Sequence, residues 1–351
     1  MYLEVEVSLL KVLKLVTKIY IILEFWEIPL TKEKIKLSII TPTYNNGALL
    51  QRLYNSIKSQ KLKELIWIIV DDGSSDNTRS IVDKFYDKRI IYKKQKNKGP
   101  NSARNFGEKF IPRGCKYVIF IDSDDTFYDH NSLEMMYEEI KNSSKKIGAV
   151  GFTCISSSTN KNVCFLDKSP LVINYEDSIK GSLFSGEFLS IQKVDILKIQ
   201  NWPENLFGFE ALRHWEINKH FDFMLINKPA RIYYRDRKTN LTSPESTIRR
   251  AKNMALGIEK IIQNHGEIIF KIAKEKYGYM LLTQSIYYAL CGLTIESFKT
   301  NFKALKIISK NKNRFISILI FFYLMLPLMV RKKLYLSVLR MNYNYITLTN
   351  N

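Results

Sequence analysis

The sequence predicts an α/β protein in which a mainly parallel central sheet is flanked by helices and followed by a helical carboxyl-terminal region. Two observations lead to this fold class. Short apolar runs alternate with helical stretches from Leu37 to Asp122, which is the pattern of strand–helix–strand repeats with right-handed crossovers. The apolar runs are rich in Ile and Val without polar alternation, which indicates strands covered on both faces.

The predicted elements follow one another in a regular order. Runs such as "LSIIT" and "YVIFID" predict strands at 37–41, 65–72, 89–94 and 117–122. Helices are expected between them, at 48–60, 78–86 and 102–110. Beyond Ala149 the pattern is mixed, with strands predicted at 149–154, 223–227 and 231–235 and helical stretches from about Thr247 to Ser309.

Three regions are expected along the chain. Residues 1–35 form an amphipathic helical segment, whose stripe of lysines suits packing on a domain or lying at a membrane interface. Residues 36–245 form the α/β domain, divided at residue 130 into halves 36–130 and 131–245. Residues 246–351 form the helical region.

The net charge restricts the choice of partners. With 54 Lys and Arg against 34 Asp and Glu, the formal charge of +20 favours polyanions such as nucleic acid, anionic lipid or nucleotide phosphates. Nucleic acid is not expected, because the basic residues are spread along the chain instead of gathering with aromatic residues in one module. The four cysteines show no CxxC spacing, which disfavours zinc or redox chemistry and suits the reduced thiols of a cytosolic protein.

Polar segments follow the predicted strands and point to a functional site. They are "TPTYNN" (41–46), "DDGSSDNT" (71–78), "NKGPNSARN" (97–105) and "DSDD" (122–125). Ligands of open α/β sheets bind beyond the carboxyl ends of the strands, where these segments are expected to meet. A solvated, capped turn explains any one of them, but it does not readily explain all four.

The acidic residues of these segments suggest a divalent cation. Asp122 and Asp124 are separated by one residue, so both can reach one side of an extended backbone. Carboxylates this close repel one another unless a cation lies between them, and oxygen ligands select Mg²⁺ or Mn²⁺. In "NKGPNSARN", Gly99 permits close backbone approach, and Arg104 is a bidentate donor for phosphate or for a site aspartate.

Taken in order and spacing, "SIITPTYNN", "IIVDDGSSDNT", "NKGPNSARN" and "FIDSDD" resemble the nucleotide-sugar-binding domain of the family 2 glycosyltransferases, which have the GT-A fold. The resemblance is tight over about 36–130 and loose to about 240. It implies that Pro42, Tyr44 and Asp72 line the base pocket and that Arg104 lies by the nucleotide. It further implies that Asp122 contacts ribose and that Asp124 binds the metal, with Asp125 in a supporting role. The other residues expected to bind the nucleotide sugar are Thr41, Asn45, Ser74, Asn97, Gly99 and Ser123.

The reaction implied by the resemblance is inverting transfer of one sugar, from a donor expected to be a UDP-sugar, to an acceptor hydroxyl. The base in many relatives is the Asp of a Glu-Asp pair, whereas Glu210 is followed here by Ala211. Glu210 is the candidate base, with Glu204 or His214 as alternatives, and His214 equally suits an ordinary surface or core histidine. The acceptor is expected to be a glycan or lipid-linked hydroxyl of cell-surface polysaccharide synthesis. The alternative is a catalytically silent member that binds a nucleotide sugar or a partner transferase.

The segment "FISILIFFYLMLPLMV" (315–330) predicts contact with a membrane. Its sixteen residues are short for a span, which needs about 20 apolar residues. Basic residues on both sides suit a helix lying in the plane of an anionic membrane or entering it partway, and the alternative is a buried helix. Because the amino terminus does not resemble a secretory signal, the expected location is cytoplasmic, peripheral at the inner face of the cell membrane.

Overall fold

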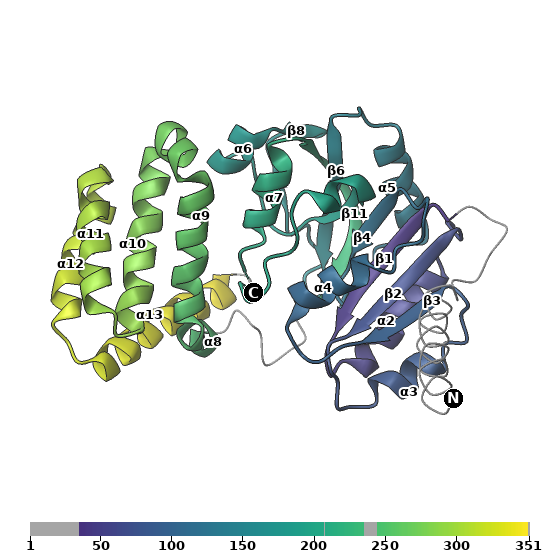
Figure 1. Cartoon of the computed structure of the whole chain (residues 1–351), viewed down its shortest axis with the longest axis horizontal. Coiled ribbons are helices and arrows are strands. Elements are labelled where there is room, and N and C mark those ends of the chain that lie inside the picture. Colours follow the sequence, from purple (N-terminus) through teal and green to yellow (C-terminus); the bar gives the residue numbers. More distant parts are fainter. Residues whose placement is uncertain (1–34, 207, 235–243, 350–351) are drawn as a thin grey trace, which may run out of the picture.

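The structure, a computed structural model, describes residues 35–206, 208–234 and 244–349. The amphipathic helix predicted for 1–35 lies outside these residues, apart from Ile35. Figure 1 shows a sheet with helices on both faces, coloured purple to teal, and beside it a group of helices coloured green to yellow.

The first half of the sheet contains four parallel strands in the order β3-β2-β1-β4. They are β1 (Leu37–Thr43), β2 (Leu65–Asp71), β3 (Ile90–Lys94) and β4 (Tyr117–Phe120). The connecting helices are α2 (Gly47–Lys58), α3 (Thr78–Asp83) and α4 (Pro100–Glu108). Every residue of β1 and β2 is buried, as their unbroken apolar runs predict.

Both faces of this half are covered by helices. Alternate side chains of β1 and β2, including Ile39 and Ile69, pack with Leu50 and Leu53 of α2. The intervening side chains, including Ile40 and Val70, pack with Ala103 of α4. The two faces therefore have separate apolar cores, and the predicted α/β class is confirmed.

The second half of the sheet is mixed. Strand β10 (Leu189–Lys193) lies between β4 and β6 (Ile147–Ser156) and is antiparallel to both. Strand β11 (Asp222–Tyr233) is parallel to β6, and β5 (Thr126–Phe127) and β8 (Leu171–Ile173) are antiparallel to β11. The remaining elements of this half are α5 (Ser132–Lys141), β7 (Phe165–Leu166), α6 (Tyr175–Lys180), β9 (Phe184–Ser185), a short 3₁₀ helix (Val194–Lys198) and α7 (Ala211–Asn218).

Two predicted strands, 223–227 and 231–235, are one strand in the structure. Strand β11 continues through Pro229, where its register against β6 shifts twice. Because proline has no N–H to donate, the ladder is irregular there, yet pairing resumes at Arg231. The prediction of two strands was therefore wrong, although both segments are extended.

The carboxyl-terminal region is helical, as predicted. Its helices are α8 (Pro244–Arg249), α9 (Ala251–Ile272), α10 (Lys274–Leu290), α11 (Thr294–Ile307), α12 (Asn311–Leu324) and α13 (Leu328–Thr349). Segment 315–330 is not a single helix, because α12 ends at Leu324 and Pro327 precedes α13. Within the described ranges, we find no helix that combines the length and the apolar character needed to cross a membrane.

Candidate active site

The polar segments predicted from the sequence meet at one edge of the sheet. Strands β2, β1 and β4 are neighbours and run in the same direction, so their carboxyl ends lie together. Thr41, Pro42 and Tyr44, on β1 and just after it, differ in how far they are exposed. Pro42 is buried and Tyr44 is 49% exposed. The Thr41 hydroxyl accepts a hydrogen bond from the Trp67 indole at 2.9 Å inside the core, so we do not include Thr41 in the proposed site.

The loops that follow β1 and β2 are bound to each other. Asn45, which has a φ of 49°, accepts a hydrogen bond from the Ser75 N–H through its side-chain oxygen at 2.8 Å. Its own N–H donates to the Ser74 hydroxyl at 2.9 Å. Asn45 and Ser74 therefore fix the shape of the two loops beside the exposed Tyr44 ring.

Asp72 joins the loop after β2 to the segment before α4. Its carboxylate accepts hydrogen bonds from the N–H groups of Lys98 and Gly99, at 2.9 and 2.8 Å, and from the Gln95 amide at 2.7 Å. Gly99 has a φ of 90°, a conformation that a side chain would strain. Asn97, in the same segment, is exposed.

The other acidic side chains after β2 are also held by protein donors. Asp71 accepts hydrogen bonds from the Tyr92 hydroxyl and from the Ser74 N–H. Burial would raise the pKa of Asp71, but these hydrogen bonds outweigh it, so the pKa lies below its ordinary value. Asp76 accepts from the Thr78 N–H at 3.0 Å, at the start of α3. These residues shape the loop.

Arg104 connects α4 to the acidic segment after β4. Its guanidinium donates to the Asp122 carboxylate at 2.8 Å and to the Asn101 side chain at 2.8 Å. The Asp122 side chain remains 49% exposed, whereas that of Arg104 is largely covered. The predicted proximity of Arg104 to the acidic cluster is therefore present in the structure.

The remaining residues of "DSDD" point in different directions. Asp124 is partly exposed, and the buried Ser123 hydroxyl accepts a hydrogen bond from the Asn46 side chain at 2.6 Å. Asp125 is 2% exposed and forms an ion pair at 3.0 Å with Arg231 of β11. Burial raises the pKa of Asp125, and the Arg231 guanidinium opposes that rise. Asp125 thus anchors the segment that carries Asp122 and Asp124.

The donor set fits a metal ion that a nucleotide diphosphate completes. Over the ranges that the structure describes, no group of three or more His, Cys, Asp or Glu side chains could hold an ion without further ligands. Mg²⁺ is commonly bound by one or two carboxylates together with substrate phosphates. Asp122, which also pairs with Arg104, and Asp124 are partly exposed and could supply those carboxylates, whereas Asp125 is buried against Arg231.

Two residues that the sequence analysis missed contact the segment 122–125. Arg52 of α2 donates a hydrogen bond to the Asp124 carbonyl oxygen, and its guanidinium lies 3.4 Å from the centre of the Tyr234 ring. The backbone N–H of Tyr234 also donates to Asp125 at 3.3 Å. The basic and aromatic composition of "RIYYRDRKTNLT" was the available signal, although the loop 235–243 lies outside the described residues.

The loop before α7 is fixed to α4. The Trp202 N–H donates to the Asn105 side chain at 2.8 Å, and Asn101 donates to the Pro203 carbonyl oxygen at 3.0 Å. The Glu204 carboxylate accepts from Asn105 at 3.0 Å. The Arg104 guanidinium lies 5.0 Å from the centre of the Trp202 ring, so this loop reaches Arg104.

A buried charged pair supports the same contact. Arg213 of α7 is fully buried and lies 4.0 Å from Glu108 of α4, which accepts a hydrogen bond from the Trp202 indole at 3.0 Å. Burial raises the pKa of Glu108 to about 7 and lowers that of Arg213 to about 10. The sequence analysis did not identify either residue, because their separation along the chain gives no sign of contact.

Glu210 directly precedes α7, at its N-cap position, and is partly exposed. Its carboxylate accepts a hydrogen bond from the Gly208 N–H at 3.3 Å. His214 contacts the rings of Trp202 and Phe223, with centroid separations of 6.0 and 6.2 Å. Burial, together with Arg213 and Arg104, lowers the pKa of His214 to about 4. His214 thus packs among aromatic rings, and Glu210 remains the candidate base.

The carboxyl-terminal helical region packs against α7 and the residue Phe209 before it. Phe209 and Leu212 pack in one apolar cluster with Ala251, Ala255 and Ile258 of α9. At Gly257 an added Cβ would lie 2.4 Å from the Phe209 ring, so only glycine permits this approach. Glu210 is therefore positioned by two separate parts of the molecule, α4 and α9.

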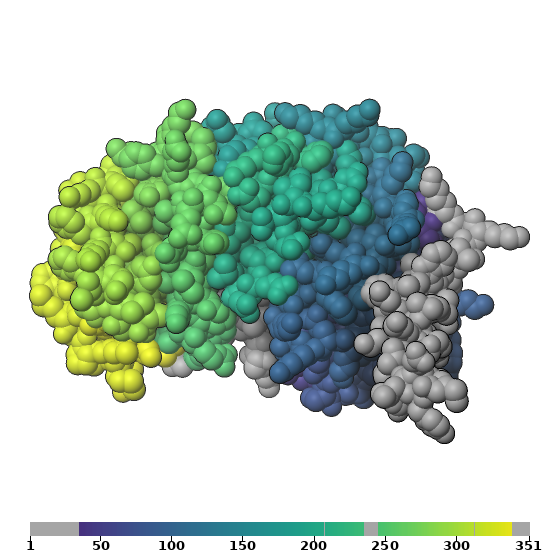
Figure 2. All heavy atoms as spheres, in the orientation of Figure 1, coloured from purple at the N-terminus to yellow at the C-terminus, as the bar shows by residue number. Residues whose placement is uncertain are grey.

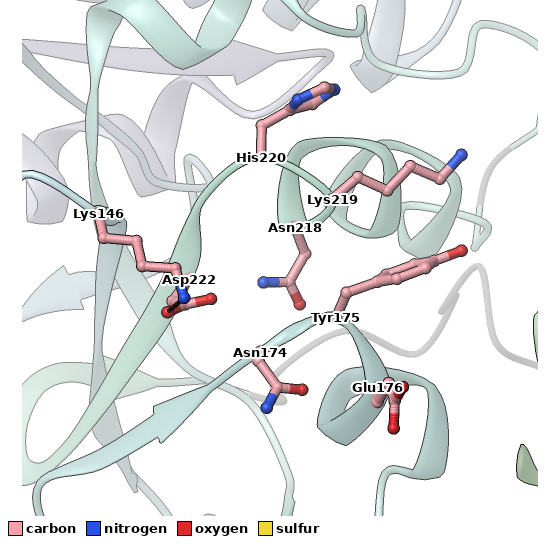
Figure 3. Close-up of a pocket in the computed structure, with 8 residues that line it drawn as sticks. All are labelled: Lys146, Asn174, Tyr175, Glu176, Asn218, Lys219, His220 and Asp222. Atoms are coloured by element: carbon pink, nitrogen blue, oxygen red, sulfur yellow. Dashed lines mark ion pairs between the residues drawn. The ribbon is translucent and has the colours of Figure 1, made fainter.

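A surface depression of about 280 Å³ lies elsewhere and is shown in Figure 3. Its lining includes Tyr175, Asn218 and the ion pair between Lys146 and Asp222, which are 2.9 Å apart. It lies at the amino-terminal ends of β6 and β11, which run in the same direction as β4. It is therefore at the opposite edge of the sheet from Asp122 and Asp124.

Comparison with known proteins identifies the family. Residues 38–170 match the model of glycosyl transferase family 2. The chain is 31% identical over 280 residues to the GalNAc(5)-diNAcBac-PP-undecaprenol beta-1,3-glucosyltransferase of Campylobacter jejuni, a match that covers 77% of this chain and 85% of that protein. The chain belongs to glycosyltransferase family 2. It is accordingly a glycosyltransferase.

Two further similar proteins come from Staphylococcus aureus. The Staphylococcus aureus poly(ribitol-phosphate) beta-N-acetylglucosaminyltransferase TarP is 37% identical over 123 residues, which is 33% of this chain and 37% of that protein. The crystal structure of S. aureus TarS 1-349 in complex with UDP-GlcNAc shares the fold, with a TM-score of 0.55 at 18% identity over 78% of this chain and 82% of that chain. The predicted GT-A fold is confirmed.

Proposed function

We propose that this glycosyltransferase moves one sugar from a UDP-sugar to a hydroxyl of a glycan or lipid-linked acceptor in cell-surface polysaccharide synthesis. The observation that carries the proposal is the contact of Arg104 with Asp122 beside the partly exposed Asp124, at the carboxyl ends of three neighbouring parallel strands. The lipid-linked acceptor is supported by the name of the C. jejuni relative, which includes PP-undecaprenol.

The donor is proposed to bind across the loops after β1, β2 and β4. The exposed Tyr44 ring and Pro42 would contact the base, with Asn45, Ser74, Asn97 and Gly99 forming the surrounding loops. A carboxylate has about four acceptor positions, and Asp72 already uses three, so one remains for a base N–H. Asp122 would accept from ribose, with Ser123 supporting its segment.

Asp124 and Asp122 would hold Mn²⁺ or Mg²⁺ together with the diphosphate. When bound, such an ion stabilises the negative charge that develops on the leaving diphosphate. Arg104 would add a second positive charge on the same side, because its guanidinium already contacts Asp122.

Glu210 is proposed to remove the proton from the acceptor hydroxyl. The acceptor oxygen then forms a bond to the anomeric carbon while the bond from that carbon to the diphosphate breaks, and the proton passes to the Glu210 carboxylate. One displacement of this kind inverts the anomeric configuration. The support for Glu210 is its partial exposure directly before α7. The preceding segment is held by α4 through Trp202 and by α9 through Phe209.

Donor turnover with purified variants tests this assignment. Glu210→Gln is expected to lower kcat about a thousandfold, because general base catalysis contributes factors of this size. Asp124→Ala is expected to lower kcat at least about a hundredfold, because it removes a proposed ligand of the stabilising cation. The matched control is Asp83→Asn, which breaks the exposed ion pair with Arg79 and should leave turnover unchanged.

The outcomes distinguish the alternatives. Full turnover by Asp124→Ala would remove Asp124 from the metal site, and full turnover by Glu210→Gln would move the base to Glu204 or another group. Donor binding measured by thermal shift, with no turnover by the wild-type protein, would instead favour the silent family member that Ala211 suggests.

A further inference from the structure

The helical region ends in an apolar surface that faces solvent. We define this end surface by Phe298 of α11, by Phe315, Leu319 and Phe322 of α12, and by Met325 and Met329 at the junction with α13. Phe322 is 63% exposed and Met325 is 80% exposed. Figure 2 shows α11 and α12, in yellow-green and yellow, at the end of the molecule remote from the sheet.

Helix α12 is apolar on both of its sides. Phe315, Leu319 and Phe322 recur at a spacing of four and three residues, which places them on one exposed stripe. On the inner side, Ile320 is 4% exposed and Ser317 is fully buried. A surface helix of a globular protein places polar residues toward water, so the exposed stripe of α12 requires another explanation.

The surface continues from α12 onto α11. The ring of Phe298 on α11 contacts that of Phe321 on α12, with centroids 5.1 Å apart. A buried pair of polar side chains fixes the two helices relative to each other, because Ser317 donates a hydrogen bond to Asn301 at 2.8 Å. The apolar residues are therefore held as one rigid surface.

The helices that carry this surface are also rich in positive charge. From residue 292 onward the chain has ten Lys and Arg and one acidic residue, Glu296. Lys299, Lys303 and Lys306 of α11 are exposed, and so is Arg314 of α12. The Lys306 ammonium lies 4.5 Å from the centre of the Phe302 ring, so cationic and apolar groups adjoin directly.

We propose that α11, α12 and the start of α13 dock onto a bilayer of anionic phospholipid, with the end surface in the acyl boundary and the lysines at the headgroups. Interfacial helices bind in this way through apolar area and attraction to anionic lipid. The 14 residues of α12 extend about 21 Å, which is less than the hydrocarbon thickness, so α12 lies in the plane of the membrane.

The positive charge of these helices argues against a second copy of the chain as the partner of the end surface. In a two-fold symmetric dimer the same patch meets itself, so Lys299, Lys303 and Lys306 of one copy would face a patch of the same charge. A bilayer rich in anionic lipid presents the opposite charge.

This inference deepens the proposed function, since a lipid-linked acceptor would lie in the same bilayer, but binding to vesicles requires neither donor nor acceptor. Co-sedimentation of the full-length protein with vesicles of phosphatidylcholine, with and without about one quarter phosphatidylglycerol, measures it directly. We expect binding to the anionic vesicles that weakens at high salt, because lysines near an anionic surface act through a screened attraction.

Two variants separately test the apolar side chains and the lysines. Phe315→Ser with Leu319→Ser and Phe322→Ser should weaken vesicle binding at least about tenfold, because the inserted apolar area is lost. Lys299→Gln with Lys303→Gln and Lys306→Gln should weaken it at least about tenfold and reduce the salt dependence. The matched control is Tyr86→Ser with Phe165→Ser and Val172→Ser, which removes exposed apolar side chains from the α/β domain and should bind as wild type.

The lysine variant still tests the proposal if the serine variant fails to fold. Wild-type protein that ignores anionic vesicles would overturn the proposal, and so would serine and lysine variants that bind like wild type. A dimer that the serine substitutions dissociate would assign the surface to a second copy instead. Glu210→Gln should bind vesicles as wild type does, so failure of catalysis and failure of docking are observed separately.

Discussion

Two groups of acidic side chains lie at neighbouring strand ends, and their surroundings differ. After β2, the carboxylates of Asp71, Asp72 and Asp76 all accept hydrogen bonds from protein donors. After β4, Asp125 is buried against Arg231, while Asp122 and Asp124 remain partly exposed. Protein donors bind all three carboxylates of the first group, of which Asp76 is exposed. In the second group Asp125 is buried, while Asp122, which Arg104 binds, and Asp124 are partly exposed.

The difference shows how a protein can keep acidic residues accessible for a ligand. Asp125 fixes its segment from within through the ion pair to β11, so Asp122 and Asp124 do not need to turn inward. The group after β2 instead orders the loops that form the base side of the proposed site, because Asp72 connects them to the segment before α4. Acidic residues of the same type thus differ in their burial and in their partners.

The largest expected effect on stability comes from Asp125→Asn. This change removes the buried carboxylate from Arg231 and leaves only that of the exposed Glu187, 3.6 Å away. Breaking a buried ion pair costs about 3–5 kcal/mol of unfolding free energy. Chemical denaturation measures the loss. Asp83→Asn, which breaks the exposed pair with Arg79, is the matched control and should cost less than about 1 kcal/mol. Equal losses in the two variants would show that Asp125 is not an anchor.

A smaller loss is expected from Asp72→Asn. The amide keeps one oxygen acceptor but places an NH₂ group near the N–H groups of Lys98 and Gly99, so the unfolding free energy should fall by about 1–3 kcal/mol. The KM for donor should rise more than kcat falls, because the loop is disturbed and the base is not. Gln95→Ala removes the side-chain donor alone and should cost about 1 kcal/mol or less. An unchanged KM in Asp72→Asn would separate this loop from donor binding.

The smallest effect is a dependence of stability on pH from Asp71. Its pKa is lower in the folded protein than in the unfolded chain, so its contribution is fully present above about pH 4 and is lost as the pH falls through the folded pKa. Denaturation of wild type and Asp71→Asn at pH 7 and pH 3 should show a loss on acidification that is about 1 kcal/mol smaller in the variant. Tyr92→Phe, which removes one donor, should lie between them. The same loss in all three proteins would contradict this account.

Much of the first half of the fold could be predicted from the sequence. The unbroken apolar runs of β1 and β2 correctly predicted fully buried strands, and the bounds of the first seven elements differ from the predicted ones by no more than three residues. The second half was harder, because β10 lies between β4 and β6 although it follows both in the chain. Local patterns do not report which distant strand a segment will join.

The candidate site, like the fold, was predicted only in part. The residue types after β1, β2 and β4 predicted a shared site, since parallel strands bring their carboxyl ends together. The contacts of Asn105 with Trp202, of Arg52 with Tyr234 and of Phe209 with Gly257 were not predicted. Each contact joins residues that are far apart in the chain, and a local motif such as "NKGPNSARN", which contains Asn105, does not report which distant residue its side chains will meet.

The sequence by itself determined the family, the α/β class and the strand ends at which acidic residues gather, because these depend on local apolar runs and short motifs. The tertiary structure decided how far each acid is exposed: Asp125 is buried against Arg231 and Asp72 accepts from Gly99, while Asp122 and Asp124 stay partly exposed. It also decided that α12 keeps an apolar stripe in solvent, because its other side is already covered by the bundle. Burial and pairing depend on the whole fold, and for that reason identical side chains at adjacent positions acquire different roles.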